Sequence, residues 1–238
     1  MDRDLVKILG IDVDSFTFDE AVNWAYSNHG QIVTINPEMI SCANSSPDFA
    51  NVIKDAQLVV PDGIGVEIGL KILGHRVKRI AGIELGKALI IKFSKEGKSI
   101  AFVGAKPEIV DKAIKNLKSE ISCLNVVYSH DGYFEDDEEV LNSLTLSKPD
   151  LVLVALGSPK QEFFISKLKK NLPEATMIGL GGSFDVWAGA VKRAPLIYQR
   201  MGLEWLYRTI KEPQRFKRIF PTLPLFVLKV LKEKLCHY

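Results

Sequence analysis

Short apolar runs alternate with longer segments of mixed polarity over residues 1–193. The apolar runs rich in β-branched residues predict strands at residues 7–11, 31–35, 58–60, 99–103, 125–128, 151–155 and 176–179. Segments with apolar residues every three or four positions predict helices at residues 18–27, 38–43, 65–73, 83–95, 107–118, 135–144 and 159–171. The run LVLVAL at residues 151–156 is apolar throughout, which indicates burial on both faces. The pattern therefore predicts an α/β fold, a Rossmann-like layered domain with a mostly parallel sheet.

The pattern changes beyond Pro195, where strand-like runs stop and aromatic, basic segments begin. Side chains that can form an apolar stripe recur there at spacings of three and four, at positions 216, 219, 220, 223, 227, 230, 231 and 234. This spacing predicts an amphipathic helical appendage, which Pro213, Pro221 and Pro224 break into at least two helices. We expect one domain over residues 1–193 and an appendage over residues 194–238. The appendage is a candidate to complete the active site of the domain.

The charge of the chain divides in the same place. The whole chain carries a net charge of +2. Eleven basic and three acidic residues from Lys192 onward leave this tail at +8, so the residues before it carry −6. An acidic body with a basic tail indicates a separate partner for the tail, and anionic membrane and nucleic acid are the candidates.

Several familiar classes of site and targeting signal lack support. The three cysteines are scattered and form no CxxC pair, so they give neither a disulfide framework nor a recognisable zinc site. The first residues are acidic where a signal peptide is basic. No window approaches the roughly 20 uncharged apolar residues of a membrane-spanning helix. We therefore expect a cytoplasmic protein.

Polar residues stand where the second and third predicted strands end. In an open parallel sheet, ligands gather beyond the carboxyl ends of the strands, and Thr34, Asn36 and Asp62 fall there. Asn36 precedes Pro37 and is either a ligand contact or only a helix N-cap. No capping role accounts for Thr34. Asp62 is either a turn residue or a general base whose pKa is raised by burial.

Glycine-containing turns follow three of the later predicted strands. Their small residues let a nucleotide approach the backbone, and the helix N-termini behind them favour phosphate. Ordinary turns between strand and helix explain each of them singly, and neither GxGxxG nor GxxxxGK[ST] occurs. Taken together they predict a nucleotide site formed by Gly104, Ala105, Lys106, Gly157, Lys160, Gly181, Gly182 and Asp185.

Five ordered motifs resemble the WecG/TagA/CpsF family of glycosyltransferases. They are T-x-N at 34–36, P-D-G at 61–63, R-x-x-G at 79–82, G-x-P-x-Q at 157–161 and G-x-G-G-x-F-D at 179–185. The match covers nearly the whole body in order and continues into the basic tail. One position departs, because Glu84 stands where the family's pattern has an aspartate.

The resemblance implies an inverting transfer of N-acetylmannosamine from UDP-N-acetylmannosamine. The implied acceptor is the 4-hydroxyl of N-acetylglucosamine on undecaprenyl diphosphate, which gives a β-1,4 link early in synthesis of the wall teichoic acid linkage unit. By the same resemblance, Asp62 is the catalytic base and Arg79 contacts a diphosphate. Thr34 and Asn36 match residues of the acceptor or sugar pocket, and Gln161 matches a donor-side contact.

Departure of UDP requires stabilisation of negative charge, which many sugar transferases obtain from a divalent metal on a D-x-D motif. The obvious D-x-D, at residues 12–14, lies near the N-terminus and beside no glycine turn. We therefore expect neither a metal nor another cofactor. Arg79, Lys106 or Lys160 and helix N-termini would take the place of the metal.

The implied lipid-linked acceptor lies in a bilayer, and the tail suits that location. An apolar stripe with excess positive charge can lie in the membrane interface, where each basic residue contributes about 1 kcal/mol. Arg208, Arg215 and Arg218 are candidates for binding the diphosphate of the acceptor. Alternatively, the apolar residues of the tail pack on the body or on a partner subunit. We expect peripheral association with the inner face of the cell membrane. The sequence leaves open whether the chain forms a homo-oligomer.

Three other interpretations compete with this one. Another UDP-sugar, such as N-acetylmannosaminuronate or a glucosyl donor, or another lipid carrier fits the same motifs, because nothing in them fixes the epimer at C2. A nucleotide-binding oxidoreductase predicts GxGxxG and an acidic residue about 20 positions later, which this chain lacks. A nucleic-acid-binding protein predicts a basic sheet face or a known module, and the acidic body argues against it.

Overall fold

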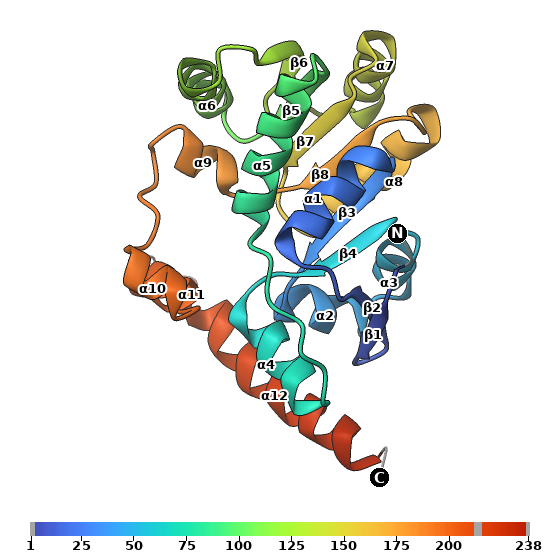
Figure 1. Ribbon diagram of the computed structural model, residues 1–238, viewed down its shortest axis with the longest axis vertical. Coiled ribbons are helices and arrows are strands. Elements are labelled where there is room, and N and C mark those ends of the chain that lie inside the picture. The colour runs from blue at the N-terminus through green and yellow to red at the C-terminus, as the bar shows by residue number, and fades with distance from the viewer. Residues whose placement is uncertain (1–2, 212–215, 237–238) are drawn as a thin grey trace.

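The structure is a computed structural model that describes residues 3–211 and 216–236. Its centre is a six-stranded parallel sheet in the order β4-β3-β8-β7-β5-β6 (Figure 1). The strands are β3 (Gly30–Ile35), β4 (Leu58–Pro61), β5 (Ser99–Gly104), β6 (Asn125–His130), β7 (Leu151–Ala155) and β8 (Thr176–Gly179). Each lies within a few residues of a predicted strand, so the α/β class and the parallel sheet are confirmed.

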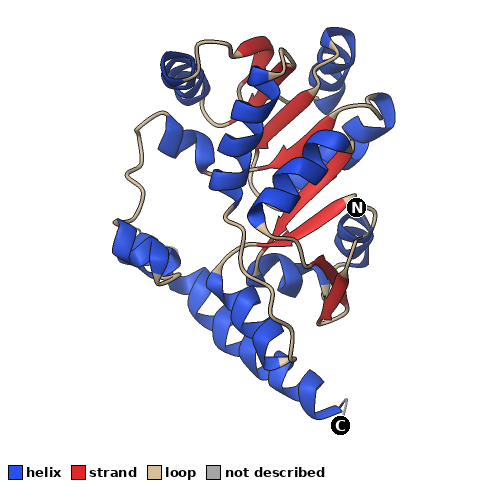
Figure 2. Cartoon of the chain, in the orientation of Figure 1, coloured by secondary structure: helices blue, strands red, loops and turns tan. Residues whose placement is uncertain are grey.

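Helices cover both faces of this sheet (Figure 2). One face is covered by α1 (Phe18–Ser27), α5 (Gly82–Lys95), α6 (Pro107–Glu120) and α9 (Ser183–Trp187). The other face is covered by α2 (Pro37–Ala43), α3 (Pro47–Lys54), α7 (Asp137–Ser147) and α8 (Lys160–Asn171). Along β7, Leu151 and Leu153 pack on the first face and Val152 and Val154 on the second. The strand is apolar throughout because neither of its faces meets water.

The carboxyl ends of all six strands lie at one edge of the sheet, on the side of α9, α10 (Leu196–Arg200) and α11 (Glu204–Lys211) in Figure 1. The crossovers from β5 to β6 and from β7 to β8 run in opposite directions along the sheet. A topological switch point therefore lies between β5 and β7, which is where open α/β sheets commonly bind ligands.

An antiparallel hairpin of β1 (Leu5–Ile8) and β2 (Ile11–Asp14) precedes the sheet. The prediction of a single strand at residues 7–11 is therefore wrong. Leu9 and Gly10 have φ angles of 48° and 81° and turn the chain. Two consecutive left-handed residues are the geometry of a tight two-residue hairpin loop, and the glycine favours it.

The predicted helices of the body are confirmed, with small shifts at their ends. The one body helix between β4 and α5 is α4 (Ile64–Ile72). Sequence reasoning missed α3, although Pro47 at its first turn and the cap Ser46, whose hydroxyl accepts from Phe49 N at 3.4 Å, are recognisable start signals. It also missed α9 and α10, each of which has only five residues.

The appendage is helical, as predicted, but Pro221 and Pro224 do not interrupt its last helix, α12 (Phe216–Cys236). That part of the prediction is wrong. Both prolines fall in the first half of the helix, where each removes one backbone hydrogen bond. Tertiary packing offsets this loss, because Phe226 and Val230 are 2% and 0% exposed against the core beside α2 and α4.

The buried face of α12 differs from the predicted stripe. Phe226 replaces Val227 as the residue that contacts the body, and Val227 and Leu231 are exposed. The carboxylate of Glu233 accepts a hydrogen bond from Leu9 N at 2.9 Å, which ties the end of the helix to the hairpin. The tail thus shares a core with the body, and the division at residue 193 stays a prediction.

Candidate active site

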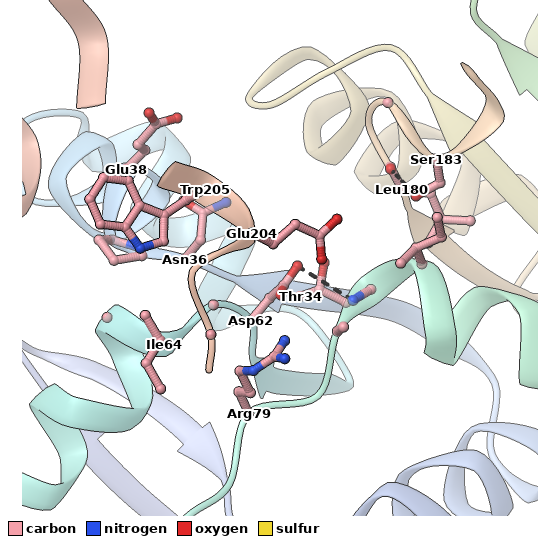
Figure 3. A pocket seen from close by; sticks show the side chains of 18 of the residues that line it. Thr34, Asn36, Glu38, Asp62, Ile64, Arg79, Leu180, Ser183, Glu204 and Trp205 are labelled. Carbon is pink, nitrogen blue, oxygen red and sulfur yellow. Dashed lines mark hydrogen bonds between the residues drawn. The ribbon is translucent and has the colours of Figure 1, made fainter. Parts of the chain in front are cut away.

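A pocket of about 300 Å³ opens at the carboxyl edge of the sheet (Figure 3). Its lining comes from the segments that follow β3, β4 and β8, from the first turns of α2, α4, α5 and α9, and from the tail. Five residues that the sequence singled out line this pocket together, namely Thr34, Asn36, Asp62, Arg79 and Gly182. The volume lies at the lower end of the range for small-molecule sites.

The pairing of β3 with β4 places Asp62 in the pocket. The two strands are parallel, with Thr34 opposite Val60. Asp62 N continues the ladder by donating to Ile35 O at 2.7 Å. Gly63, with φ 79°, then turns the chain into α4 in a conformation that L-residues rarely adopt. Backbone hydrogen bonds of the sheet therefore hold the carboxylate at the strand end.

The surroundings of Asp62 favour a base that is stronger than an ordinary aspartate. Burial raises the pKa of Asp62 from 3.8 to about 6. The N–H of Gly82, which donates to Asp62 Oδ2 at 3.4 Å, opposes this rise, as do the Arg79 cation and the N–H of Gly63. Glu204 adds a smaller upward contribution to the pKa. The group is mostly ionised at neutral pH and can accept a proton from a hydroxyl.

Helix N-termini surround this carboxylate. No side chain caps the first turns of α4 and α9, and the first N–H of α5, at Gly82, faces Asp62; all three turns line the pocket. Such turns offer backbone N–H groups and the positive end of the helix dipole, a combination that binds phosphate. At α2, Asn36 Oδ1 accepts from Met39 N at 3.0 Å, so the predicted N-cap role of Asn36 is confirmed. These turns are therefore suited to an anionic group of a ligand.

Arg79 connects the pocket to the tail. Its guanidinium Nη2 donates to the carbonyl of Gln199 in α10 at 2.6 Å, and its backbone N–H donates to Glu67 Oε2 at 2.9 Å. These bonds hold a positive charge close enough to Asp62 to lower its pKa. One side chain thus faces the proposed base and anchors the appendage.

The tail supplies one wall of the pocket through Gly202, Glu204, Trp205 and Leu223. Gly202 has φ 70°, and a Cβ there would lie 2.7 Å from Ile64 Cβ, so only glycine permits this approach of the tail to α4.

Arg193 fastens that wall to the body. Its guanidinium contacts Glu204 at 3.6 Å through Nε and Glu84 at 2.7 Å through Nη2. It therefore bridges the first turn of α5 and the first turn of α11.

Gln161 lies behind the pocket and does not line it. It is 5% exposed, its Oε1 accepts from Gly181 N at 2.9 Å, and its Nε2 donates to Glu162 Oε1 at 2.7 Å. Both ends of the amide are thus engaged inside the protein. Gln161 holds the turn that carries Gly182, and a direct contact with the donor stays a prediction.

The other predicted nucleotide residues lie at the same edge of the sheet, beyond β8, and do not line this pocket. They are Gly104, Ala105, Lys106, Gly157, Lys160, Gly181 and Asp185. Ala105 N donates to Ala155 O at 3.0 Å, so the turns after β5 and β7 meet at the switch point. The ammonium of Lys160 lies 4.8 Å from the centre of the Phe134 ring. Their nucleotide role stays a prediction.

The D-x-D segment has a structural role in β2. Asp14 is fully buried, pairs with Arg3 at 2.6 Å and accepts from Val59 N at 2.8 Å, which ties the hairpin to β4. Asp12 is half-exposed and lies 3.6 Å from Lys7. Among residues 3–211 and 216–236, no three His, Cys, Asp or Glu side chains cluster as metal ligands would. The metal-independent mechanism stays a prediction.

The three tail arginines proposed for the acceptor diphosphate fall outside what the structure describes. Arg215 lies outside the described residues, and so do the side chains of Arg208 and Arg218, although the helices that carry the last two are described.

Comparison with known proteins adds to this geometry. The model of the "Glycosyl transferase WecG/TagA/CpsF family" matches residues 6–238, which includes the tail. The chain belongs to this glycosyltransferase family. It is 38% identical over 225 residues to a Bacillus spizizenii protein named N-acetylglucosaminyldiphosphoundecaprenol N-acetyl-beta-D-mannosaminyltransferase, covering 94% of this chain and 87% of that one. A Bacillus subtilis protein of the same name is 39% identical over 204 residues, covering 85% and 79%.

Among the residues of this family member's pocket that escaped sequence reasoning are Glu204 and Trp205. A signal for Glu204 was present, because it is one of only three acidic residues in the basic tail. No comparable signal marked Trp205, since an aromatic residue in an amphipathic segment is as readily a core residue as a ligand contact.

Proposed function

We propose that this chain transfers N-acetylmannosamine from UDP-N-acetylmannosamine to the 4-hydroxyl of N-acetylglucosamine on undecaprenyl diphosphate. The reaction inverts the anomeric centre, forms a β-1,4 bond and belongs to synthesis of the wall teichoic acid linkage unit. The family and the names of the two Bacillus relatives support this proposal. The observation that carries it is a carboxylate with a raised pKa in a pocket surrounded by helix N-termini.

Asp62 acts as the general base of a single displacement. It takes the proton of the acceptor hydroxyl while the oxygen attacks the anomeric carbon from the side opposite UDP. The bond from that carbon to the diphosphate oxygen breaks, and its electron pair leaves with UDP. A pKa of about 6 makes the carboxylate a better proton acceptor than an ordinary aspartate and leaves it ionised at neutral pH.

Stabilisation of the departing diphosphate falls to Arg79 and to the first turns of α4, α5 and α9. These donors are fixed in place before the reaction, which is the arrangement that stabilises developing charge most effectively. Lys106 and Lys160, at the turns after β5 and β7, would extend the positive field toward the rest of the nucleotide.

The appendage docks on the cytoplasmic face of the membrane in this proposal. In residues 3–211 and 216–236 no helix has both the length and the apolar character needed to cross a bilayer. Large apolar side chains of the tail are nevertheless exposed, namely Leu196, Ile197, Met201, Leu225, Leu228, Leu231 and Leu235. Lys229, Lys232 and Lys234 accompany them on α12. Apolar and basic groups together favour an anionic interface.

Release of UDP tests the activity. The full chain is incubated with UDP-N-acetylmannosamine, with and without lipid-linked N-acetylglucosamine, and the linkage of the product is determined. The proposal predicts acceptor-stimulated release and a β-1,4 disaccharide. A panel with UDP-N-acetylmannosaminuronate and a glucosyl donor decides the sugar, and faster transfer from either would overturn the assignment of N-acetylmannosamine.

Sedimentation with anionic vesicles tests the membrane surface. A Leu228→Ser/Leu231→Ser variant should lose most binding, because it removes apolar area from the exposed side of α12. Leu146→Ser is the matched control, since Leu146 is 84% exposed on α7, away from the tail. Equal binding by all three proteins would contradict the role of α12.

A further inference from the structure

The pocket has two chemically different ends, with Asp62 between them. Figure 3 shows Trp205 and Glu38 on one side of Asp62, and Leu180 and Ser183 on the other. The Leu180 end belongs to the glycine turn after β8. The order of the strands continues from β8 to β7 and β5, whose turns carry the other predicted nucleotide residues. The Trp205 end instead borders the first turn of α2 and the tail.

Two adjacent residues at the start of α11 give the tail end its chemistry. The indole of Trp205 lines the pocket and is 36% exposed, so it presents a broad apolar surface to a ligand. Glu204 lines the same pocket, and Figure 3 shows its carboxylate directed toward the region of Asp62 and Thr34. Sugars carry hydroxyl donors around a ring whose C–H groups form apolar faces. An aromatic surface beside a carboxylate matches both features.

We propose that Glu204 and Trp205 form the binding subsite for the acceptor sugar, with the ring packed on the Trp205 indole and one of its hydroxyls donating to Glu204. This proposal rests on the proposed transferase function and deepens it. The subsite delivers a second hydroxyl of the same ring to Asp62. The tail therefore contributes recognition of the acceptor, whereas the body contributes the base.

The assignment to the acceptor rather than the donor follows from charge and position. The donor brings a diphosphate that needs positive groups, and the first turns of α5 and α9, which offer backbone N–H groups, lie toward the glycine turn. A carboxylate would repel that diphosphate but accepts hydrogen bonds from a neutral ring. The contact with Arg193, at 3.6 Å, holds the Glu204 carboxylate in the pocket wall.

Kinetics with a water-soluble acceptor test the subsite without interference from membrane binding. In this acceptor a short alkyl chain replaces the polyprenyl group, and UDP-N-acetylmannosamine is the donor. Trp205→Ala should raise the acceptor KM by about tenfold, which is about 1.4 kcal/mol of binding, and leave the donor KM within about twofold. Trp205→Phe should recover part of the loss. Glu204→Gln should raise the acceptor KM by about fivefold.

Two controls separate recognition from general damage to the tail. Ile210→Ala alters a 64% exposed residue of the same helix that lies outside the pocket lining. Lys211→Ala alters an exposed residue at the end of the same helix that also lies outside the pocket lining. Both controls should keep the acceptor KM within about twofold of the unaltered chain.

Calorimetric titration of the acceptor into the donor-free protein makes the outcome independent of turnover. Weakened acceptor binding by Trp205→Ala and Glu204→Gln, but not by the controls, supports the subsite even if the donor proves to be another UDP-sugar. Unchanged acceptor affinity in both variants overturns it, as does a donor KM that rises as much as the acceptor KM. Normal turnover with unchanged acceptor affinity would reject the subsite alone and leave the proposed function standing.

Discussion

The two walls of the pocket are built in different ways. The wall from the body consists of strand ends, where the ladder between β3 and β4 fixes Thr34 and Asp62 through backbone hydrogen bonds. The wall from the tail consists of Gly202, the start of α11 and Leu223 on α12, and the bonds of Arg193 and Arg79 attach this wall to the body. Phe226 and Val230 on α12 add the apolar part of this attachment.

This difference matches the demands of the two tasks. Proton transfer requires a base held within hydrogen-bond reach of its target, and a buried parallel sheet provides that constancy. A lipid-linked acceptor must instead be collected from a membrane surface, and a helical segment with one face on the body and apolar side chains exposed on the other suits that task. The chemistry therefore resides in the body, and recognition is shared with the tail.

The largest effect is expected at the body wall. Asp62→Asn keeps an acceptor for the Gly82 N–H but cannot take a proton, so kcat should fall by about a thousandfold. Steady-state UDP release measures this loss. A variant that folds normally and keeps about a tenth or more of the activity would remove Asp62 from the mechanism, because loss of a general base costs at least about a hundredfold.

The same variant should gain stability. Burial raises the pKa of Asp62 to about 6 from 3.8, so the folded protein binds this proton more tightly than the unfolded chain. The ionised carboxylate therefore costs stability above pH 6, and the cost disappears below pH 3.8. Asp62→Asn should be more stable than the unaltered chain by about 1 to 2 kcal/mol at pH 8, and the gain should shrink toward pH 4. Urea denaturation at the two pH values measures this.

The next effect tests attachment of the tail wall. Phe226→Ala removes a side chain that is 2% exposed between α12 and the body, and should lower the free energy of unfolding by about 3 kcal/mol. Activity should fall with it, because α12 carries Leu223 into the pocket. Leu225→Ala, at a residue that is 56% exposed, is the control and should change stability by less than about 0.5 kcal/mol. Full activity of folded Phe226→Ala would show that the tail wall is dispensable.

A smaller effect is expected behind the pocket. Gln161→Met keeps the volume but leaves Gly181 N without its side-chain partner, so the glycine turn loses its support and the donor KM should rise by about fivefold. Gln57→Met is a matched control, because Gln57 Oε1 accepts from Gln31 N at 2.9 Å away from the pocket. Both variants should lose similar stability. An equal rise of the donor KM in the control would refute a specific role for Gln161.

The smallest effect concerns pH. The base works only when ionised, so kcat/KM should rise with pH and reach about half of its plateau near pH 6, the pKa of Asp62. Measuring kcat/KM between about pH 5 and pH 8 covers the titration of a carboxyl with this pKa and locates the midpoint. A midpoint near 4 would mean that the pocket does not desolvate Asp62 in solution.

Local pattern was sufficient to predict most of the fold. Runs such as LVLVA encode a strand buried on both faces, and helix start signals such as Asn36 followed by Pro37 encode a cap. The rule that ligands gather at the carboxyl ends of parallel strands then predicts that Thr34 and Asp62 share one pocket, and both line it. The failures at Leu9 and at Pro221 arose where a turn or tertiary packing overrode the local pattern.

The sequence by itself therefore determined the six strands of the sheet, most helices of the body, the class of the fold and the carboxylate at the end of β4. Tertiary structure alone decided that Gln161 bonds to the glycine turn, and that Glu204 and Trp205 line the same pocket as Asp62. The reason is physical: periodicity reports which side of an element is buried, whereas docking of the tail depends on long-range contacts, such as those of Arg193 and Phe226, that no local spacing encodes.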